Sequence, residues 1–159
     1  MPAFNTLCGK NVEIEISIDH KEGKPPSAEL QALAVKVVYA LDVLVPKAIA
    51  ALWADLNGDE NHFSRVWWHG DLEGAFDLSD DVDPPTNPKE LASFLKPEGI
   101  SLRPSVWKYK KPVVILHFKS DIDAEHGIGM LTDGEQIIGI GYSADPAPFF
   151  GREYPPTSK

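Results

Sequence analysis

The chain has 159 residues and a formal net charge of -9, with 43% apolar and 25% charged residues. This composition is ordinary for a globular domain and argues against a disordered chain. Nucleic acids and membrane surfaces are anionic and repel such a protein at long range, so we expect neither as a partner, whereas a basic protein is attracted.

The cysteine content and the apolar segments indicate a cytoplasmic protein. Cys8 is the only cysteine, which excludes an intramolecular disulfide and a multi-cysteine zinc site. No basic region followed by an apolar stretch opens the sequence, so we expect no signal peptide. The apolar segment from Ala32 to Trp53 is interrupted by lysines, an aspartate and a proline, which is typical of buried helices and not of a membrane span. We expect one domain over residues 1–159.

In the N-terminal part, the pattern predicts one strand followed by two helices. Apolar and polar residues alternate from Val12 to Ile18, which is typical of a half-buried strand. Ser27 is a suitable N-cap for a helix whose apolar residues follow the helical period as far as Leu44. Pro46 then favours the first turn of a second helix, because its missing N–H needs no partner there.

The middle of the chain predicts a short helix and two strands. The segment Asn87–Glu90 resembles a capping box, and the helix that it starts is expected to end before Pro97. Residues 100–107 are expected to form an edge strand, since Pro104 disfavours a central position. Val113 to Phe118 is a continuous apolar run with one histidine, which predicts a buried strand.

A hairpin is predicted from residues 127–132 and 135–142, because Asp133-Gly134 is a strong signal for a two-residue turn. That turn places glycines opposite large side chains: Gly129 opposite Ile138, Gly127 opposite Ile140 and Gly139 opposite Ile128. Such glycines fix the register and let another element approach the hairpin closely. Residues 145–159, with four prolines, are expected to form an irregular tail.

Together, these elements predict an α+β fold. We expect an antiparallel sheet of about five strands, with the helical pair packed on one face.

One cluster of titratable residues lies between two predicted strands. If the chain is extended there, Asp121, Asp123 and Glu125 share one side, because strand side chains alternate. With His126, they can hold a hard divalent cation or act as an acid and base. The alternative is a solvated connection whose acids accept hydrogen bonds from turn amides. A small metal-dependent enzyme or metal sensor is therefore our second hypothesis for the function.

Other catalytic signals are missing from the sequence. It has no nucleophile elbow, phosphate-binding loop, dinucleotide fingerprint or paired metal-binding cysteines. Asp55 to Asp59 opens like a calcium loop, but Glu60 stands where that loop needs glycine. We therefore expect no catalytic residue and no cofactor.

The segment from residue 57 to 85 combines aromatic and acidic residues without a regular pattern. Exposed aromatic residues anchor interfaces, acids steer a basic partner, and long irregular segments in compact domains tend to be functional. The alternative buries both tryptophans and leaves the acids solvated. The candidate partner-binding residues are Trp67, Trp68, Asp71, Glu73, Asp77, Asp80, Asp81 and Asp83.

The segment Asp123–Gly129, followed by Gly139-Ile140-Gly141, resembles the C-terminal signature of uncharacterised bacterial domains of unknown function. That signature is W-D-x-E-H-G and a hairpin, and this chain has Ile122 at the position that is often tryptophan. Some of those domains resemble immunity proteins encoded beside toxins. The resemblance implies an interaction role and no activity for Glu125 or His126. Our first hypothesis is an acidic immunity protein that neutralises a bacterial toxin by direct binding, most suitably a nuclease with a basic active site.

Overall fold

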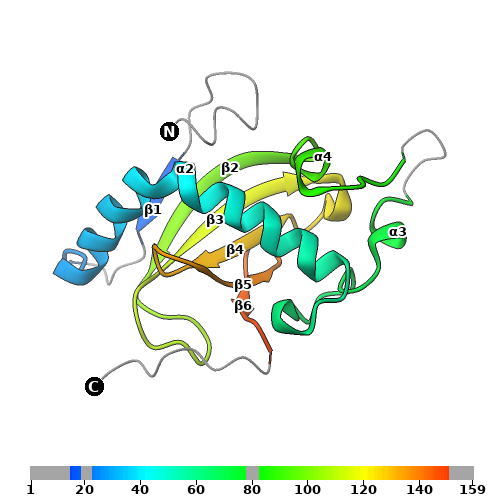
Figure 1. The fold of residues 1–159 in the computed structure, drawn as a ribbon. Helices are drawn as coiled ribbons and strands as arrows, with labels where there is room; N and C mark the ends of the chain where they lie inside the picture. Colours follow the sequence, from blue (N-terminus) through cyan, green and yellow to red (C-terminus); the bar gives the residue numbers. More distant parts are fainter. Residues whose placement is uncertain (1–14, 19–22, 78–82, 151–159) are drawn as a thin grey trace.

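The computed structural model describes residues 15–18, 23–77 and 83–150. Within these residues, six strands form one sheet in sequence order, and the long helix α2 crosses one face of it (Figure 1). The strands are β1 (Glu15–Ile18), β2 (Leu95–Arg103), β3 (Val113–Ser120), β4 (Ile128–Thr132), β5 (Ile137–Gly141) and β6 (Ala147–Pro148). The helices are α2 (Ala28–Leu56), α3 (Leu72–Ala75) and α4 (Pro88–Ala92), with the 3-10 turns η1 (Glu60–His62) and η2 (Asp121–Asp123). The predicted α+β class is confirmed.

The sheet is mixed and not purely antiparallel as predicted. β1 pairs in parallel with β2, whereas each of the later neighbours pairs antiparallel. The connection from β1 to β2 explains the parallel pair. It contains α2, and a helical crossover of this kind joins two strands that run in the same direction. Residues 12–14 of the predicted first strand lie outside the described residues.

The predicted helical pair is one helix, so the predicted break at Pro46 is wrong. α2 begins after Ser27, whose hydroxyl accepts a hydrogen bond from the Leu30 N–H at 3.2 Å, as the sequence predicts. Pro46 lies inside α2 and removes the helical donor to the Asp42 carbonyl. Both residues are exposed, so water can bind that carbonyl. The buried residues around Pro46 form one continuous stripe: Leu41, Leu44, Val45, Ala48 and Leu52.

This stripe of α2 packs on the sheet and forms the main core. Its partners include Leu116 and Phe118 of β3 and Met130 of β4, all fully buried. In the part of the chain that the structure describes, α2 is also the one helix long and apolar enough to cross a membrane by length and composition. Its buried side faces the sheet, as in the core helix of a globular domain.

The strand predicted over residues 100–107 is shifted and is not at an edge. β2 runs from Leu95 to Arg103 and lies between β1 and β3. Pro104 follows the last residue of β2, so it removes no hydrogen bond from the sheet. Pro97 is tolerated inside β2 because the pairing with β3 is irregular between Pro97 and Gly99.

Both strands of the predicted hairpin are present, but the predicted register is wrong. Gly129 pairs with Gly141, and Gly139 pairs with Leu131. The Asp133 carboxylate accepts hydrogen bonds at 2.9 Å from the N–H groups of two following residues, Glu135 and Gln136. This side-chain bonding stabilises a four-residue connection in place of the two-residue turn.

The close approach expected from the hairpin glycines is confirmed. The chain after β5 folds back over the hairpin, so a methyl group at Gly139 would collide with the Ala147 carbonyl. At Gly141 it would lie 2.9 Å from the Cα atom of Pro146. The segment predicted as an irregular tail thus contributes β6, and residues 151–159 lie outside the described residues.

The face of the sheet opposite α2 has an apolar part and a polar part. Tyr109, Val113, Ile115, Leu131 and Ile138 form a second, smaller core on this face. Farther along β3 on the same face, the alternation of side chains places His117 and Lys119. The fold therefore leaves a polar surface beside a packed one.

Candidate functional site

Trp68 belongs to the core, which corrects its predicted place on the partner-binding surface. Its side chain is 0% exposed, and its indole N–H donates to Asp55 Oδ2 at 2.8 Å. Asp55 is also fully buried, and its Oδ1 accepts from the Ser64 N–H at 3.1 Å and lies 2.6 Å from His69 Nδ1. Asp55 therefore joins the end of α2 to the following loop, a structural role that no sequence pattern indicates.

Trp67 lies at the surface and joins two acidic segments. Its side chain is 47% exposed, and its indole N–H donates to Asp123 Oδ2 at 3.1 Å. The two residues are 56 positions apart in the sequence. This hydrogen bond brings the aromatic-acidic segment and the Asp/Glu/His cluster to one surface.

The chain around Asp123 is a turn and not the extended segment that we expected. Asp123 lies in η2, and its Oδ1 accepts from the His126 N–H at 2.9 Å and lies 2.9 Å from His126 Nδ1. Burial raises the pKa of Asp123, but hydrogen bonds from the His126 N–H, the Trp67 indole and the His126 ring lower it below its usual value. Asp123 is therefore a carboxylate at neutral pH.

The turn does not bring the four residues considered as metal ligands together around one centre. Among the described residues, no group of three or more His, Cys, Asp and Glu side chains is placed to hold a metal ion. Asp121 and Glu125 are exposed, while Asp123 and His126 bind each other. Asp123 accepts a hydrogen bond from the His126 amide, as the alternative interpretation expects of the acids in this connection.

The other predicted partner-binding acids have different environments. Asp71 caps α3, where its Oδ1 accepts from the Gly74 N–H at 3.0 Å. Glu73, Asp77 and Asp83 are exposed, whereas Asp80 and Asp81 lie outside the described residues. Figure 1 shows α3 and the connection from β3 to β4 toward the same end of the molecule. The hydrogen bond from Trp67 to Asp123 joins these two segments, and we call their residues Trp67, Asp71, Glu73, Asp121 and Asp123 the acidic end.

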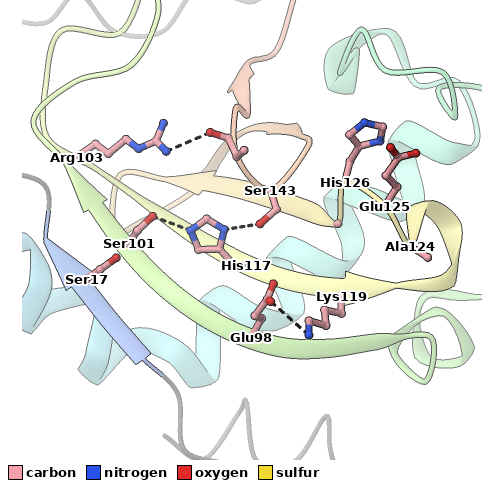
Figure 2. Close-up of a pocket in the computed structure, with 12 residues that line it drawn as sticks. Ser17, Glu98, Ser101, Arg103, His117, Lys119, Ala124, Glu125, His126 and Ser143 are labelled. Atoms are coloured by element: carbon pink, nitrogen blue, oxygen red, sulfur yellow. Dashed lines mark hydrogen bonds and ion pairs between the residues drawn. The ribbon is translucent and has the colours of Figure 1, made fainter.

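A second candidate site is a hollow of about 480 Å³ on the sheet face opposite α2 (Figure 2). We call it the trough. Its walls come from β1, β2, β3, the connection after η2 and the segment after β5. The glycines of the hairpin make this shape possible, because they let the segment with Ser143 and Ala144 lie close over the sheet. No local sequence pattern indicates the trough, since its residues come from five separate segments.

His117 occupies the middle of the trough between two serines. Its Nε2 lies 2.6 Å from Ser101 Oγ, and its Nδ1 lies 2.7 Å from Ser143 Oγ. Burial lowers the pKa of His117, and the charges of Glu98 and Arg103 act in opposite directions on it. The imidazole is therefore neutral at neutral pH, so one serine donates to it and the other accepts from it.

The charged residues of the trough include one pair and two single charges. Lys119 Nζ lies 3.6 Å from Glu98 Oε1, so these charges largely compensate each other. Arg103 donates a hydrogen bond to the Ala144 carbonyl at 3.1 Å. Glu125 lies on the connection after η2, and Figure 2 shows it at the end of the trough away from Arg103.

Comparison with known proteins identifies the family. The chain belongs to a family of domains of unknown function, DUF6985, whose profile matches residues 2–147. The predicted membership of an uncharacterised domain family is thus confirmed, while the hairpin signature and the immunity role stay predictions. No curated protein and no solved structure matches the chain.

Proposed function

We propose that this DUF6985 protein is a cytoplasmic binding protein whose acidic end docks a basic protein partner. The observation that carries the proposal is the hydrogen bond from Trp67 to Asp123. It makes one surface from an exposed aromatic ring and acids of two separate segments. Interfaces commonly combine such an aromatic anchor with charges that complement the partner.

Trp67 has the properties of an anchor residue. Its ring packs edge-on against Trp68 at 5.9 Å between centroids, and its N–H is held by Asp123. The ring is therefore already ordered, although 47% of the side chain is exposed. An ordered aromatic side chain loses little conformational entropy when a partner covers it.

The exposed acids supply attraction at longer range. Glu73 and Asp121 extend from the two segments that Trp67 joins, and both are exposed. The formal net charge of -9 adds to their field. Electrostatic attraction of this kind mainly raises the association rate and weakens as salt is added.

The finer form of the proposal is an immunity protein that neutralises a cognate bacterial toxin. It is supported by the resemblance of residues 123–129 and 139–141 to domains that include immunity-like proteins. A nuclease-type toxin fits the acidic end best, because active sites that bind phosphate are basic. Neutralisation then needs only that the acidic end covers such a site.

The test uses a charge-reversed double variant, Glu73→Lys with Asp121→Lys, as bait in its native host. The unchanged protein should capture a basic protein in a complex that added salt weakens. The double variant should bind that protein at least tenfold more weakly, about 1.4 kcal/mol for the loss of attraction between charges. Isothermal titration with the purified partner measures the change.

A matched control separates the acidic end from net charge alone. Glu29→Lys with Asp42→Lys makes the same charge change at exposed positions of α2. This control should keep nearly full affinity. Equal loss in the two double variants, or a captured partner that is acidic, would contradict the proposal. For the finer form, co-expression should relieve growth arrest by the partner.

A further inference from the structure

We propose that the trough binds a small zwitterion, namely a free amino acid or a short peptide with an ammonium and a carboxylate at its ends. This site is separate from the docking of a protein at the acidic end and does not depend on it. The inference comes from the charges at the two ends of the trough and from the neutral centre between them (Figure 2).

Arg103 lies at the end of the trough that binds the carboxylate of the ligand. Its guanidinium donates to the Ala144 carbonyl, and among the described residues it has no ion pair with an acid. A guanidinium has five N–H donors in one plane, so several donors are left for a ligand. The hydrogen bond to Ala144 also holds the group in place. A planar, fixed guanidinium is well suited to bind a carboxylate through two parallel hydrogen bonds.

Glu125 lies at the opposite end of the trough, which binds the ammonium group of the ligand. Its carboxylate has no hydrogen bond or ion pair with any residue that the structure describes, and it lines the trough. The neighbouring charges of Glu98 and Lys119 already compensate each other at 3.6 Å. Among the described residues that line it, the trough therefore presents one unpaired guanidinium, Arg103, and one unpaired carboxylate, Glu125. An anion is repelled by Glu125 and a cation by Arg103, whereas a zwitterion satisfies both.

The middle of the trough suits the polar, uncharged part of such a ligand. His117 is neutral, and the hydroxyls of Ser101 and Ser143 are in contact with its ring nitrogens. Each hydroxyl has both a donor and an acceptor function, so each can also bind a peptide amide. The volume of about 480 Å³ lies within the range of small-ligand sites, about 300–1,000 Å³.

The first experiment varies the ligand. Glycine, diglycine and triglycine are titrated into the ¹⁵N-labelled protein, and the backbone amide signals of Gly127 and Ser143 are followed by NMR. At least one of the three should give saturable shifts, and the length that binds best reports the spacing of the charged ends. Acetylating the amine or amidating the carboxyl group of the ligand that binds best should weaken its binding about tenfold, since each change removes a charge-assisted hydrogen bond.

The second experiment varies the protein and assigns each end. The Arg103→Gln variant lacks the group that binds the carboxylate, so the ligand with a free carboxyl group and its amide should bind this variant equally weakly. With Glu125→Gln, the free amine and its acetyl form should bind equally weakly. Two neutralised surface charges, Lys89→Gln and Glu29→Gln, are controls that should bind like the unchanged protein.

Two results would overturn this inference. The first is the absence of a saturable shift with all three ligands. The second is a preference for the zwitterion that survives both Arg103→Gln and Glu125→Gln. Neither result bears on the acidic end, because the capture of a basic partner is measured with variants of Glu73 and Asp121. Failure of that capture would leave the ligand titration equally decisive.

Discussion

Trp67 and Trp68 are consecutive, and each donates its indole N–H to an aspartate, Asp123 and Asp55 respectively. Trp68 and its aspartate are both 0% exposed, whereas Trp67 is 47% exposed. The same interaction therefore serves the core in one case and fixes a surface ring in the other. Burial, and not the kind of hydrogen bond, separates a residue that stabilises the fold from one that is free to meet a partner.

The largest effect on stability is expected from Trp68→Ala. The substitution leaves a cavity in the main core and removes one of the donors to buried Asp55. It should lower the free energy of unfolding by about 3–5 kcal/mol. Urea denaturation followed by circular dichroism measures this loss. A change below about 1 kcal/mol would show that Trp68 is not packed as described.

A smaller effect on stability, which depends on pH, is expected from Asp123→Asn. The folded state lowers the pKa of Asp123, so the native carboxylate is stabilised relative to the unfolded chain. This stabilisation is present above the pKa of 3.8 that the carboxyl group has in the unfolded chain. It is lost as the pH falls through the lower pKa of the folded state. At pH 7 the variant should be less stable by about 1 kcal/mol, because it loses charge-assisted hydrogen bonds.

The pH series also provides the test of this explanation. Urea denaturation between neutral and strongly acidic pH should show the two proteins converging as the wild-type Asp123 becomes protonated. Asp121→Asn, at an exposed neighbouring position, is the matched control and should change stability little at neutral pH. A difference between Asp123→Asn and the wild type that stays constant at low pH would rule out the carboxylate as its source.

Local sequence signals predicted the elements that depend on near neighbours. The cap at Ser27, the buried strand β3 and the two strands of the hairpin follow from patterns within a few residues. Tertiary packing decided the rest. Pro46 stays inside α2 because the buried stripe continues past it, and the hairpin register follows from the hydrogen bonds of the Asp133 side chain.

The candidate sites were predicted less completely than the fold. The sequence indicated Trp67 and the acids, but no periodicity in residues 57–85 distinguishes Trp67 from Trp68. Their difference depends on Asp55 and Asp123, which lie in other segments. The trough was invisible for the same reason, since Ser101, His117 and Ser143 meet only when the sheet is assembled.

The smallest effect on stability is expected from Trp67→Ala, the same substitution one residue away from Trp68. It removes a half-exposed ring and one hydrogen bond at the surface, so the free energy of unfolding should fall by less than about 1 kcal/mol. Affinity for the basic partner should nevertheless fall about thirtyfold, as for an anchor residue worth about 2 kcal/mol. Isothermal titration and urea denaturation on the same preparation measure both quantities.

The pair of alanine variants is informative because the two measurements should separate. Trp68→Ala should weaken binding mainly by unfolding the protein, so most of its loss of affinity should disappear in the fraction that stays folded. Trp67→Ala should lose affinity while the fold is intact, since it removes a half-exposed ring whose core contact is one edge-on packing with Trp68. If Trp67→Ala binds the partner with full affinity, the ring is not an anchor. The acids of the acidic end then have to account for binding alone, a contribution that rising salt would abolish.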